Sequence, residues 1–439
     1  NTAVGYTALL ANTTAANNTA VGYAALAANT TGTANTAVGA AVLDAATTAS
    51  HNTAMGYAAM TTTTTGSYCS AFGRGALDAH TTGADNNAFG YDALSSLTTG
   101  TNNTAMGNSA LAALTTTAGN TAFGKVALAA SVTGSYNTGV GYLALTSCLD
   151  GGSNVAVGYS ALQANTSGAN NVAVGATALD ANTTGHSGTA VGKDALGSNT
   201  TAAANTAVGF SAGAATTTGD GNSFFGYEAG DAVTTSTDNT FIGKRAGDTQ
   251  VSGANGNVVV GASSDVSKTN AGGQVVLGSA ITGTDDATCT VGYNGNTASI
   301  TLDGSDESWA AASDERLKEN VQESTVGLAF INERRPITYQ WKKKKDVPTD
   351  MRQYKKGSNE PSVGFKYGTQ HHGFIAQEVK AVIDKYDDVK DGQNIWKCGT
   401  DKTQMISKGG LITMLVKSIQ ELSAQVEELK QQAHEKCDK

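Results

Sequence analysis

Apolar and small residues recur along most of this chain with a fixed period of 17 residues. The motif Asn-Thr-Ala-Val-Gly, which opens the chain, returns with its glycine at every seventeenth position, apart from one inserted residue after Gly243. The glycines of this ladder are Gly5, Gly22, Gly39, Gly56, Gly73, Gly90, Gly107, Gly124, Gly141, Gly158, Gly175, Gly192, Gly209, Gly226, Gly243, Gly261 and Gly278. A sustained period of this length is typical of a solenoid, in which each repeat is stabilised by its neighbours.

The columns of the repeat predict one strand per coil. The column that begins with Val4 is always apolar and lies two residues after a Thr column. On a strand, residues two positions apart point to the same face. We expect this apolar column to face the core. A Leu column beginning with Leu9 is the second predicted core contribution. The small column beginning with Ala8 indicates close approach of backbones, which suggests a shared axis. In late repeats the Leu column is replaced by Gly213, Gly230 and Gly247, so we expect the coil geometry to change there.

The rest of each repeat predicts turns and a second element. Thr-Thr-Gly segments such as residues 30–32 are turn signals, and Asn and Thr at equal positions can stack into ladders. The segment 23–28 has helical propensity, so either a strand or a helical turn could follow the first strand. The Tyr column (Tyr6, Tyr23, Tyr57, Tyr91, Tyr142, Tyr159) is interpreted as surface or interface packing, with sugar stacking as the alternative.

After Gly278 the period fades and the composition changes. Residues 279–312 form a neck in which 297–302 alternates like a strand. Residues 1–312 hold 6 Lys and Arg against 18 Asp and Glu, whereas residues 313–439 hold 22 against 19. The acidic first part argues against nucleic acid as a partner, since phosphate binding needs clustered cations. No apolar run is long enough to span a membrane. Because Asn1 already begins a repeat, we expect this sequence to be the C-terminal part of a longer chain.

Few residues of this chain indicate metal or cofactor chemistry. The five cysteines are irregularly spaced and include no Cys-x-x-Cys pair, so neither a zinc site nor a disulfide framework is predicted. His371 and His372 are neighbours, which on a strand face opposite ways, so we assign no metal and no cofactor. The basic run 342–345 is interpreted as a solvated loop.

The last segment carries a heptad pattern. Its apolar residues step alternately by three and four positions, which is the a/d seam of a coiled coil. We therefore predict a coiled-coil helix over about residues 411–433. The seam consists of Ile412, Leu415, Ile419, Leu422, Val426 and Leu429.

The border at residue 313 carries the candidate chemistry. The stretch 313–321 holds Ser313 and Lys318, and by themselves these residues are read as a helix cap and a solvated lysine. However, the stretches 313–321, 336–341 and 373–379 together resemble, in content and order, the intramolecular chaperone domain at the C-termini of phage endosialidases, tailspikes and tail fibres. The resemblance implies that residues 313–439 trimerise, drive folding of the preceding fibre and then cut themselves off.

That resemblance also assigns the roles in self-cleavage. It implies Ser313 as the nucleophile, Lys318 as the assisting base and Ala312–Ser313 as the scissile bond. A serine hydroxyl needs such a base, and a lysine can act as one when its pKa is lowered. Residues 1–278 are similar to the head repeats of trimeric autotransporter adhesins and to glycine- and asparagine-rich repeats of phage tail fibres.

The sequence thus predicts a mainly β protein: a trimeric β-solenoid or β-roll-like rod at 1–278, a neck at 279–312, and a small α+β chaperone domain at 313–439 that ends in a coiled-coil helix. The expected function is a homotrimeric phage tail fibre on the virion tail, with a host cell-surface receptor as partner, for which a glycan is one candidate. No nucleic acid, membrane insertion or enzymatic turnover beyond self-cleavage is expected.

Three other functions fit parts of the pattern. A bacterial surface adhesin would use the same repeats and the same chaperone. An ice-binding solenoid would need a regular Thr array, and the Thr column is broken at Asn87, Val155, Val172 and Val258. A glycan-degrading enzyme would need paired acids on the rod, where the Asp residues are scattered singly.

Overall fold

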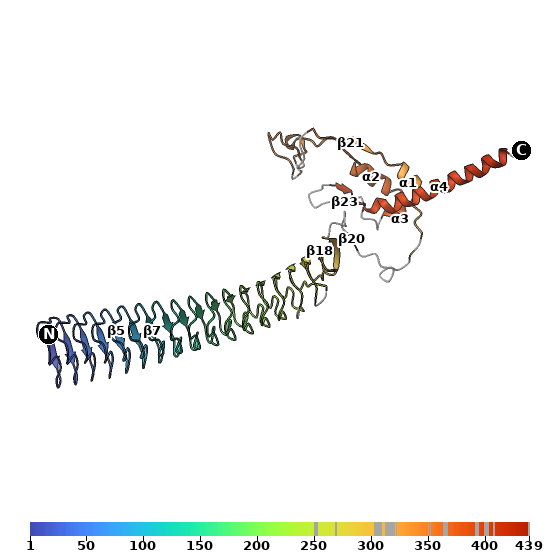
Figure 1. Cartoon of the computed structure of the whole chain (residues 1–439). Helices are drawn as coiled ribbons and strands as arrows, with labels where there is room; N and C mark the ends of the chain where they lie inside the picture. Colours follow the sequence, from blue (N-terminus) through green and yellow to red (C-terminus); the bar gives the residue numbers. More distant parts are fainter. Residues whose placement is uncertain are drawn as a thin grey trace. The chain divides into compact units, whose positions relative to one another are not determined.

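A computed structural model describes residues 1–249, 253–267, 270–302, 310–311, 321, 323–349, 351, 353–362, 368–390, 395–398, 404–406 and 409–437. The chain forms two compact units, Asn1–Ser313 and Asp314–Lys439. We refer to them as the solenoid unit and the C-terminal unit, and each is drawn in Figure 1.

The solenoid unit is a stack of coils in which each repeat supplies one short strand. Successive strands pair in parallel and in register, so that Thr19 lies between Thr2 and Thr36. The inserted residue of the fifteenth repeat is accommodated outside the strand, because Thr240 still pairs with Val258. The parallel strands are β1 Thr2–Val4, β2 Thr19–Val21, β3 Thr36–Val38, β4 Thr53–Met55, β5 Ser70–Phe72, β6 Asn87–Phe89, β7 Thr104–Met106, β8 Thr121–Phe123, β9 Thr138–Val140, β10 Val155–Val157, β11 Val172–Val174, β12 Thr189–Val191, β13 Thr206–Val208, β14 Ser223–Phe225, β15 Thr240–Ile242, β16 Val258–Val260, β17 Val275–Ser279 and β18 Thr288–Tyr293.

Two antiparallel strands follow this stack. Strand β19 (Asn296–Thr301) pairs with β18, and β20 (Ala310–Ala311) pairs with β19. The predicted mainly β solenoid with a 17-residue repeat is therefore confirmed.

The second part of each coil is neither a strand nor an α-helix in the described repeats. In the second repeat Ala24 and Leu26 have φ angles of 53° and 52°, the left-handed region that non-glycine residues seldom adopt. The Leu26 N–H donates to the carbonyl of Val42 in the next coil at 3.0 Å, whereas an α-helix would bond within its own segment. Turns that bond between coils thus replace the helical turn considered from propensity.

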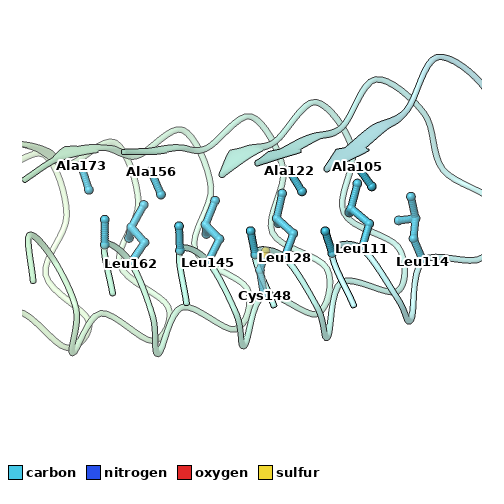
Figure 2. Close-up of a cluster of buried hydrophobic side chains, with 14 of the residues drawn as sticks. Ala105, Leu111, Leu114, Ala122, Leu128, Leu145, Cys148, Ala156, Leu162 and Ala173 are labelled. Atoms are coloured by element: carbon cyan, nitrogen blue, oxygen red, sulfur yellow. The ribbon is translucent and has the colours of Figure 1, made fainter. Parts of the chain in front are cut away.

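The core is a narrow space between the strand and these turns. From the second coil on, the middle strand residue, such as Ala20, is fully buried. So are residues of the Leu column and the small residue before them, such as Leu26 and Ala25. Figure 2 shows Leu111, Leu128, Leu145 and Leu162 in a row, with Ala105, Ala122, Ala156 and Ala173 along the strands above them. The expectation for the Leu column is confirmed.

The expectation that the apolar column of Val4 faces the core is wrong. Val4 is 58% exposed and Phe123 is 52% exposed, since residues on either side of a buried strand residue point away from the core. The buried residue of most of these strands is a small alanine, whereas the larger Val, Met or Phe two positions after the Thr column was predicted to be buried.

A buried ladder of asparagines joins the coils. The Asn35 N–H donates to the side-chain oxygen of Asn18 at 2.9 Å, and the Asn35 side-chain amide donates to the carbonyl of Ala49 at 2.8 Å. Each such amide accepts from a backbone N–H and donates to a backbone carbonyl further along the chain, as Asn35 does with Asn52 and Ala49 of the following coil, so these buried polar groups are satisfied. The ladder predicted from equal positions is confirmed for asparagine.

The glycine ladder lies where the coils touch most closely. Gly90 has φ of 139°, and a Cβ atom there would come within 2.5 Å of the carbonyl oxygen of Gly107. The equivalent glycines meet the next coil in the same way. A side chain at this column would separate the coils, which explains its invariance along the repeats.

The glycines of the late Leu column do not change the coil, contrary to the sequence-based expectation. Gly213 and Gly230 have φ of 61° and 60°, close to the 51° of Leu196 in the same column. Their missing side chains make room for the buried ring of Phe224, which stands where other strands carry alanine. A Cβ atom at Gly230 would approach that ring to 2.4 Å. The late repeats exchange a large and a small residue and keep the same backbone.

The C-terminal unit has the predicted α+β composition. It contains two antiparallel strand pairs, β21 with β22 and β23 with β24, and its last element is a long helix. The elements are α1 Leu328–Asn332, β21 Ile337–Tyr339, the 3-10 turn η2 Lys344–Asp346, β22 His371–Gly373, α2 Ala376–Ile383, α3 Asp387–Lys390, β23 Trp396–Cys398, β24 Gln404–Ile406 and α4 Gly409–Cys437. Its core is formed by Val326, Phe330, Val379, Val382, Ile383, Val389, Ile395, Leu411 and Met414.

Candidate functional site

The predicted self-cleavage residues lie outside the described part of the chain. The structure therefore does not describe the positions of Ala312, Ser313 and Lys318. On their N-terminal side, β20 ends one residue before Ala312, with Ala311 paired to Ala298 of β19. The predicted scissile bond thus directly follows a strand that completes the solenoid unit.

The structure brings together the two other stretches that carry the family resemblance. The stretch 336–341 forms β21, and the stretch 373–379 spans the end of β22 and the start of α2. Ile337 pairs with Gly373 across the two strands. Val379 of α2 is buried in the core cluster of the unit, which also includes residues of α1 and α4. The two stretches form one sheet-and-helix framework.

Helix α4 has one face buried in its own unit. Leu411, Met414 and Ser418 are each at most 7% exposed, and Leu411 and Met414 join the core cluster. One turn later, the Leu328 backbone N–H donates to the Glu421 carboxylate at 2.7 Å. This bond requires Gly327, because a Cβ atom there would lie 2.5 Å from the carboxylate oxygens. These contacts fix α4 to α1.

The other face of α4 is apolar and uncovered. Its residues are 44–67% exposed, in contrast to the buried face. They are Ile412, Leu415, Val416, Ile419, Leu422, Val426 and Leu429, which include all six positions of the predicted seam. We refer to these seven residues as the seam face. An apolar stripe of this length on one helix is typical of a coiled-coil partner surface.

The solenoid unit carries a second uncovered apolar surface. The outward column consists of one apolar residue per parallel strand: Val4, Val21, Val38, Met55, Phe72, Phe89, Met106, Phe123, Val140, Val157, Val174, Val191, Val208, Phe225, Ile242, Val260, Leu277 and Val291. All are partly or fully exposed. The Tyr column runs beside it, and the Tyr6 and Tyr23 rings stack at 5.6 Å. The six tyrosines of this column are nevertheless 45–73% exposed, so interface packing and sugar stacking both stay predictions.

One buried cysteine lies beside a buried histidine in the solenoid. His80 lies 3.9 Å from Cys69 and 3.0 Å from the Thr63 hydroxyl, and all three are buried. Burial raises the pKa of the Cys69 thiol to about 11 and lowers the pKa of His80 to about 4. Both groups are therefore neutral at pH 7, whereas nucleophilic catalysis by cysteine needs a thiolate.

Metal and membrane signals are absent from the described residues. No group of three or more His, Cys, Asp or Glu side chains there could hold a metal ion. No helix in the described ranges is both long enough and apolar enough to cross a bilayer.

Residues 313–388 match the family model described as the chaperone of endosialidase. The match confirms the resemblance predicted from the sequence, and a repetitive β-solenoid precedes the matched region. Comparisons with the curated proteins and with the solved structures find no match.

Proposed function

We propose that this chain is a homotrimeric phage tail fibre whose C-terminal unit is an intramolecular chaperone that assembles the solenoid and then releases itself. The observation that carries this proposal is the endosialidase-type chaperone match placed directly after a long solenoid. A chaperone of this kind suggests a tail fibre or tailspike. The expected location is the virion tail, where the solenoid would engage a host receptor.

The seam face supports self-association of the C-terminal unit. It exposes seven apolar side chains along a helix whose opposite face is already fixed to the unit. Burying one Leu or Ile side chain stabilises an assembly by about 1.5–3 kcal/mol. Three copies of α4 packed along the seam would remove this surface from water, and no segment of the described chain covers it.

The outward column supports association along the solenoid as well. It presents one apolar residue per coil over 18 consecutive strands. Monomeric proteins seldom expose apolar surfaces that extend this far. Since the strands are in register, identical chains aligned by their C-terminal units would bring equivalent coils to the same level. The small column at Ala8, which suggested a shared axis, is buried within each chain instead, so the outward column takes that role.

Self-cleavage is proposed at Ala312–Ser313. Lys318 accepts the proton of the Ser313 hydroxyl, and the oxygen attacks the Ala312 carbonyl carbon. The C–N bond breaks, the proton passes to the new α-amino group of Ser313, and water hydrolyses the ester between the two residues. This reaction needs no cofactor. It would leave a solenoid unit ending at β20 and a free C-terminal unit starting at Ser313.

Two measurements on freshly folded wild-type protein test the proposal. Sedimentation equilibrium under folding conditions should give three times the mass of the cleaved solenoid unit, and mass spectrometry should find a fragment that begins at Ser313. Ser313→Ala should give an intact chain of 44.3 kDa that still forms a trimer. A stable wild-type monomer would contradict the proposed assembly. An intact wild-type trimer would contradict the proposed self-cleavage and leave the proposed assembly standing.

A further inference from the structure

Most positive charges of the solenoid unit lie in one column of the repeat. This column is the residue directly after each ladder glycine; it includes the Tyr column, and we refer to it as the aromatic–cation column. Residues 1–312 hold 6 Lys and Arg, and four of them belong to it: Arg74, Lys125, Lys193 and Lys244. None of the 18 Asp and Glu of residues 1–312 belongs to it. An acidic solenoid therefore carries one basic and aromatic stripe.

The aromatic–cation column lies on the surface of the solenoid unit. All four cations are exposed, as are the aromatic residues between them. The Arg74 guanidinium lies 5.2 Å from the ring centre of Tyr91 and donates to the hydroxyl of that tyrosine at 2.7 Å. The Lys193 ammonium lies 5.4 Å from the ring centre of Phe210. The cations thus lie along the aromatic rings, and both kinds of group remain open to a partner.

The cations of the column are sparse and largely unpaired. Lys193 forms an ion pair with Asp194 at 2.6 Å. Arg74, Lys125 and Lys244 form no ion pair with the residues that the structure describes. Successive cations are three or four coils apart, which corresponds to about 14–19 Å at a strand spacing of about 4.8 Å. A partner that follows the column would therefore meet one positive charge in every few coils.

This arrangement decides among the candidate partners. Another copy of this chain would bury unpaired cations, and aligned chains would bring like charges to the same level, both of which are costly. Nucleic acid is far more densely charged, with one phosphate per about 3.4 Å of strand. A polysaccharide with one carboxylate in every few sugars fits, because its sugar faces pack on aromatic rings and each carboxylate meets a single Lys or Arg.

A surface cavity opens at one end of the aromatic–cation column. Its volume is about 490 Å³, and it is lined by Tyr227, Lys244 and Arg245. The Lys244 ammonium lies 5.9 Å from the ring centre of Tyr227. Arg245 is engaged by Glu228 at 2.7 Å, so Lys244 supplies the charge that is open to a partner. The cavity thus combines an aromatic wall, one cation and room for a sugar.

We propose that the aromatic–cation column binds a linear polysaccharide that carries one carboxylate in each repeating unit of a few sugars, with the polymer running along the solenoid. This inference deepens the host-receptor role in the proposed function and rests on that role. Aromatic side chains pack against the sugars, and Arg74, Lys125 and Lys244 bind carboxylates. Because the column extends over many coils, weak contacts add up along one polymer.

The first test compares three soluble probes by calorimetric titration of the wild-type protein at physiological ionic strength. They are gellan fragments, which carry one glucuronate in each tetrasaccharide unit, the same fragments with reduced carboxyl groups, and oligogalacturonate, which is charged on every sugar. The gellan fragments should bind at least tenfold more tightly than either of the others. Equal binding of the reduced fragments, stronger binding of oligogalacturonate, or no binding of any probe would overturn the inference and leave the proposed assembly and self-cleavage standing.

The second test moves one charge. Lys125→Met keeps the length of the side chain and should weaken gellan binding about tenfold, since a hydrogen bond to a charged group contributes on that order. Lys125→Met combined with Thr133→Lys is the matched control, because it returns the charge to an exposed residue of the same coil outside the column. The double variant should bind as weakly as the single one. Recovered binding would mean that only overall charge matters, and would overturn the column as the site.

The third test removes one ring. Tyr142 is 45% exposed and follows Lys125 by one coil. Tyr142→Leu should weaken gellan binding about three- to tenfold, whereas Tyr142→Phe keeps the ring and should stay within twofold of the wild type. If Tyr142→Leu bound as tightly as the wild type, the rings would only pack on one another and the inference would be overturned. Gellan binding by a protein that sediments as a monomer would contradict the proposed assembly and support this inference.

Discussion

Glycine sets the spacing between coils of the solenoid, and one position tests this directly. Gly90→Ala would place a methyl group 2.5 Å from a backbone oxygen of the next coil at a φ of 139°, where neither atom can move without separating the strands. We expect a loss of about 3 kcal/mol in the free energy of unfolding of the surrounding coils, from backbone strain and overpacking together. Amide hydrogen exchange of the coils on both sides measures it.

Gly256→Ala is the control for backbone strain. Gly256 also has a positive φ, 67°, but a Cβ atom there meets nothing within 4 Å. The expected loss is about 1 kcal/mol. Equal losses for the two variants would mean that coil contact is not the reason for the ladder.

Histidine in the core makes the stability of one region depend on pH. His80 is fully buried and its pKa is about 4 in the folded chain, against an ordinary value of 6.5. The unfolded chain therefore takes up a proton at a pH where the folded chain does not, and stability falls as the pH drops from about 6.5 to about 4. Linkage gives a loss of about 3 kcal/mol across this window and no change above it.

His80→Asn tests that dependence, because Asn29, Asn165, Asn182 and Asn199 occupy the same column in other coils. Amide exchange of the coils around residue 80 should be slower in the variant than in the wild type at pH 4.5 and similar at pH 7. If the exchange rates of wild type and variant differed by the same factor at pH 4.5 and at pH 7, His80 would be excluded as the cause of the pH dependence.

The sequence pattern predicted where the strands and repeat columns lie better than it predicted which side chains point into the core. The ladder of Gly5 and its equivalents, the Leu column and the strand at Asn-Thr-Ala-Val-Gly could all be predicted, because period and residue type fix them. The direction of Val4 could not, since in Thr-Ala-Val the larger residue is not the buried one. The left-handed φ of Leu26 was also beyond prediction, because a bond to the next coil overrides its local preference.

At the scale of elements, α4 has one buried face and one exposed apolar face, and the proposed trimer assigns folding to the first and association to the second. Ile419→Asp places a charge on a side chain that is 67% exposed, whereas Met414→Asp places it on one that is 1% exposed. The first variant should keep helical circular dichroism and lose the trimer in sedimentation. The second should unfold the C-terminal unit, since a buried unpaired carboxylate is costly. Gln420→Asp is the control on the exposed surface outside the seam and should retain the trimer.

If Ile419→Asp remained a trimer, the seam would not be the contact between chains. The seam itself could be predicted from its three-and-four spacing alone, whereas the buried face could not, because Ser418 and Glu421 interrupt its apolar pattern. The cleavage residues of the same unit stay a prediction, since they lie in the part of the chain that the structure does not describe.

At the scale of the whole molecule, a stack of non-local strand pairs is slow to begin. Each coil must pair with a residue 17 positions away, so the first contacts close loops before any stacking stabilises them. A C-terminal unit that holds three chains in register would lower this initial cost. The coils then add one after another by contact with their neighbours.

Release of that unit should make assembly irreversible in practice. Wild-type trimer, cleaved at Ala312–Ser313 and freed of the C-terminal unit, should unfold slowly in denaturant and fail to refold on dilution, because the three solenoid chains must then find register unaided. Ser313→Ala trimer should refold under the same conditions, since it keeps the template. The yield of trimer after one cycle of unfolding and dilution, measured by sedimentation, should differ by at least tenfold. Equal recovery of both proteins would mean that the repeats find their register by themselves, and that the C-terminal unit serves some step other than starting the solenoid.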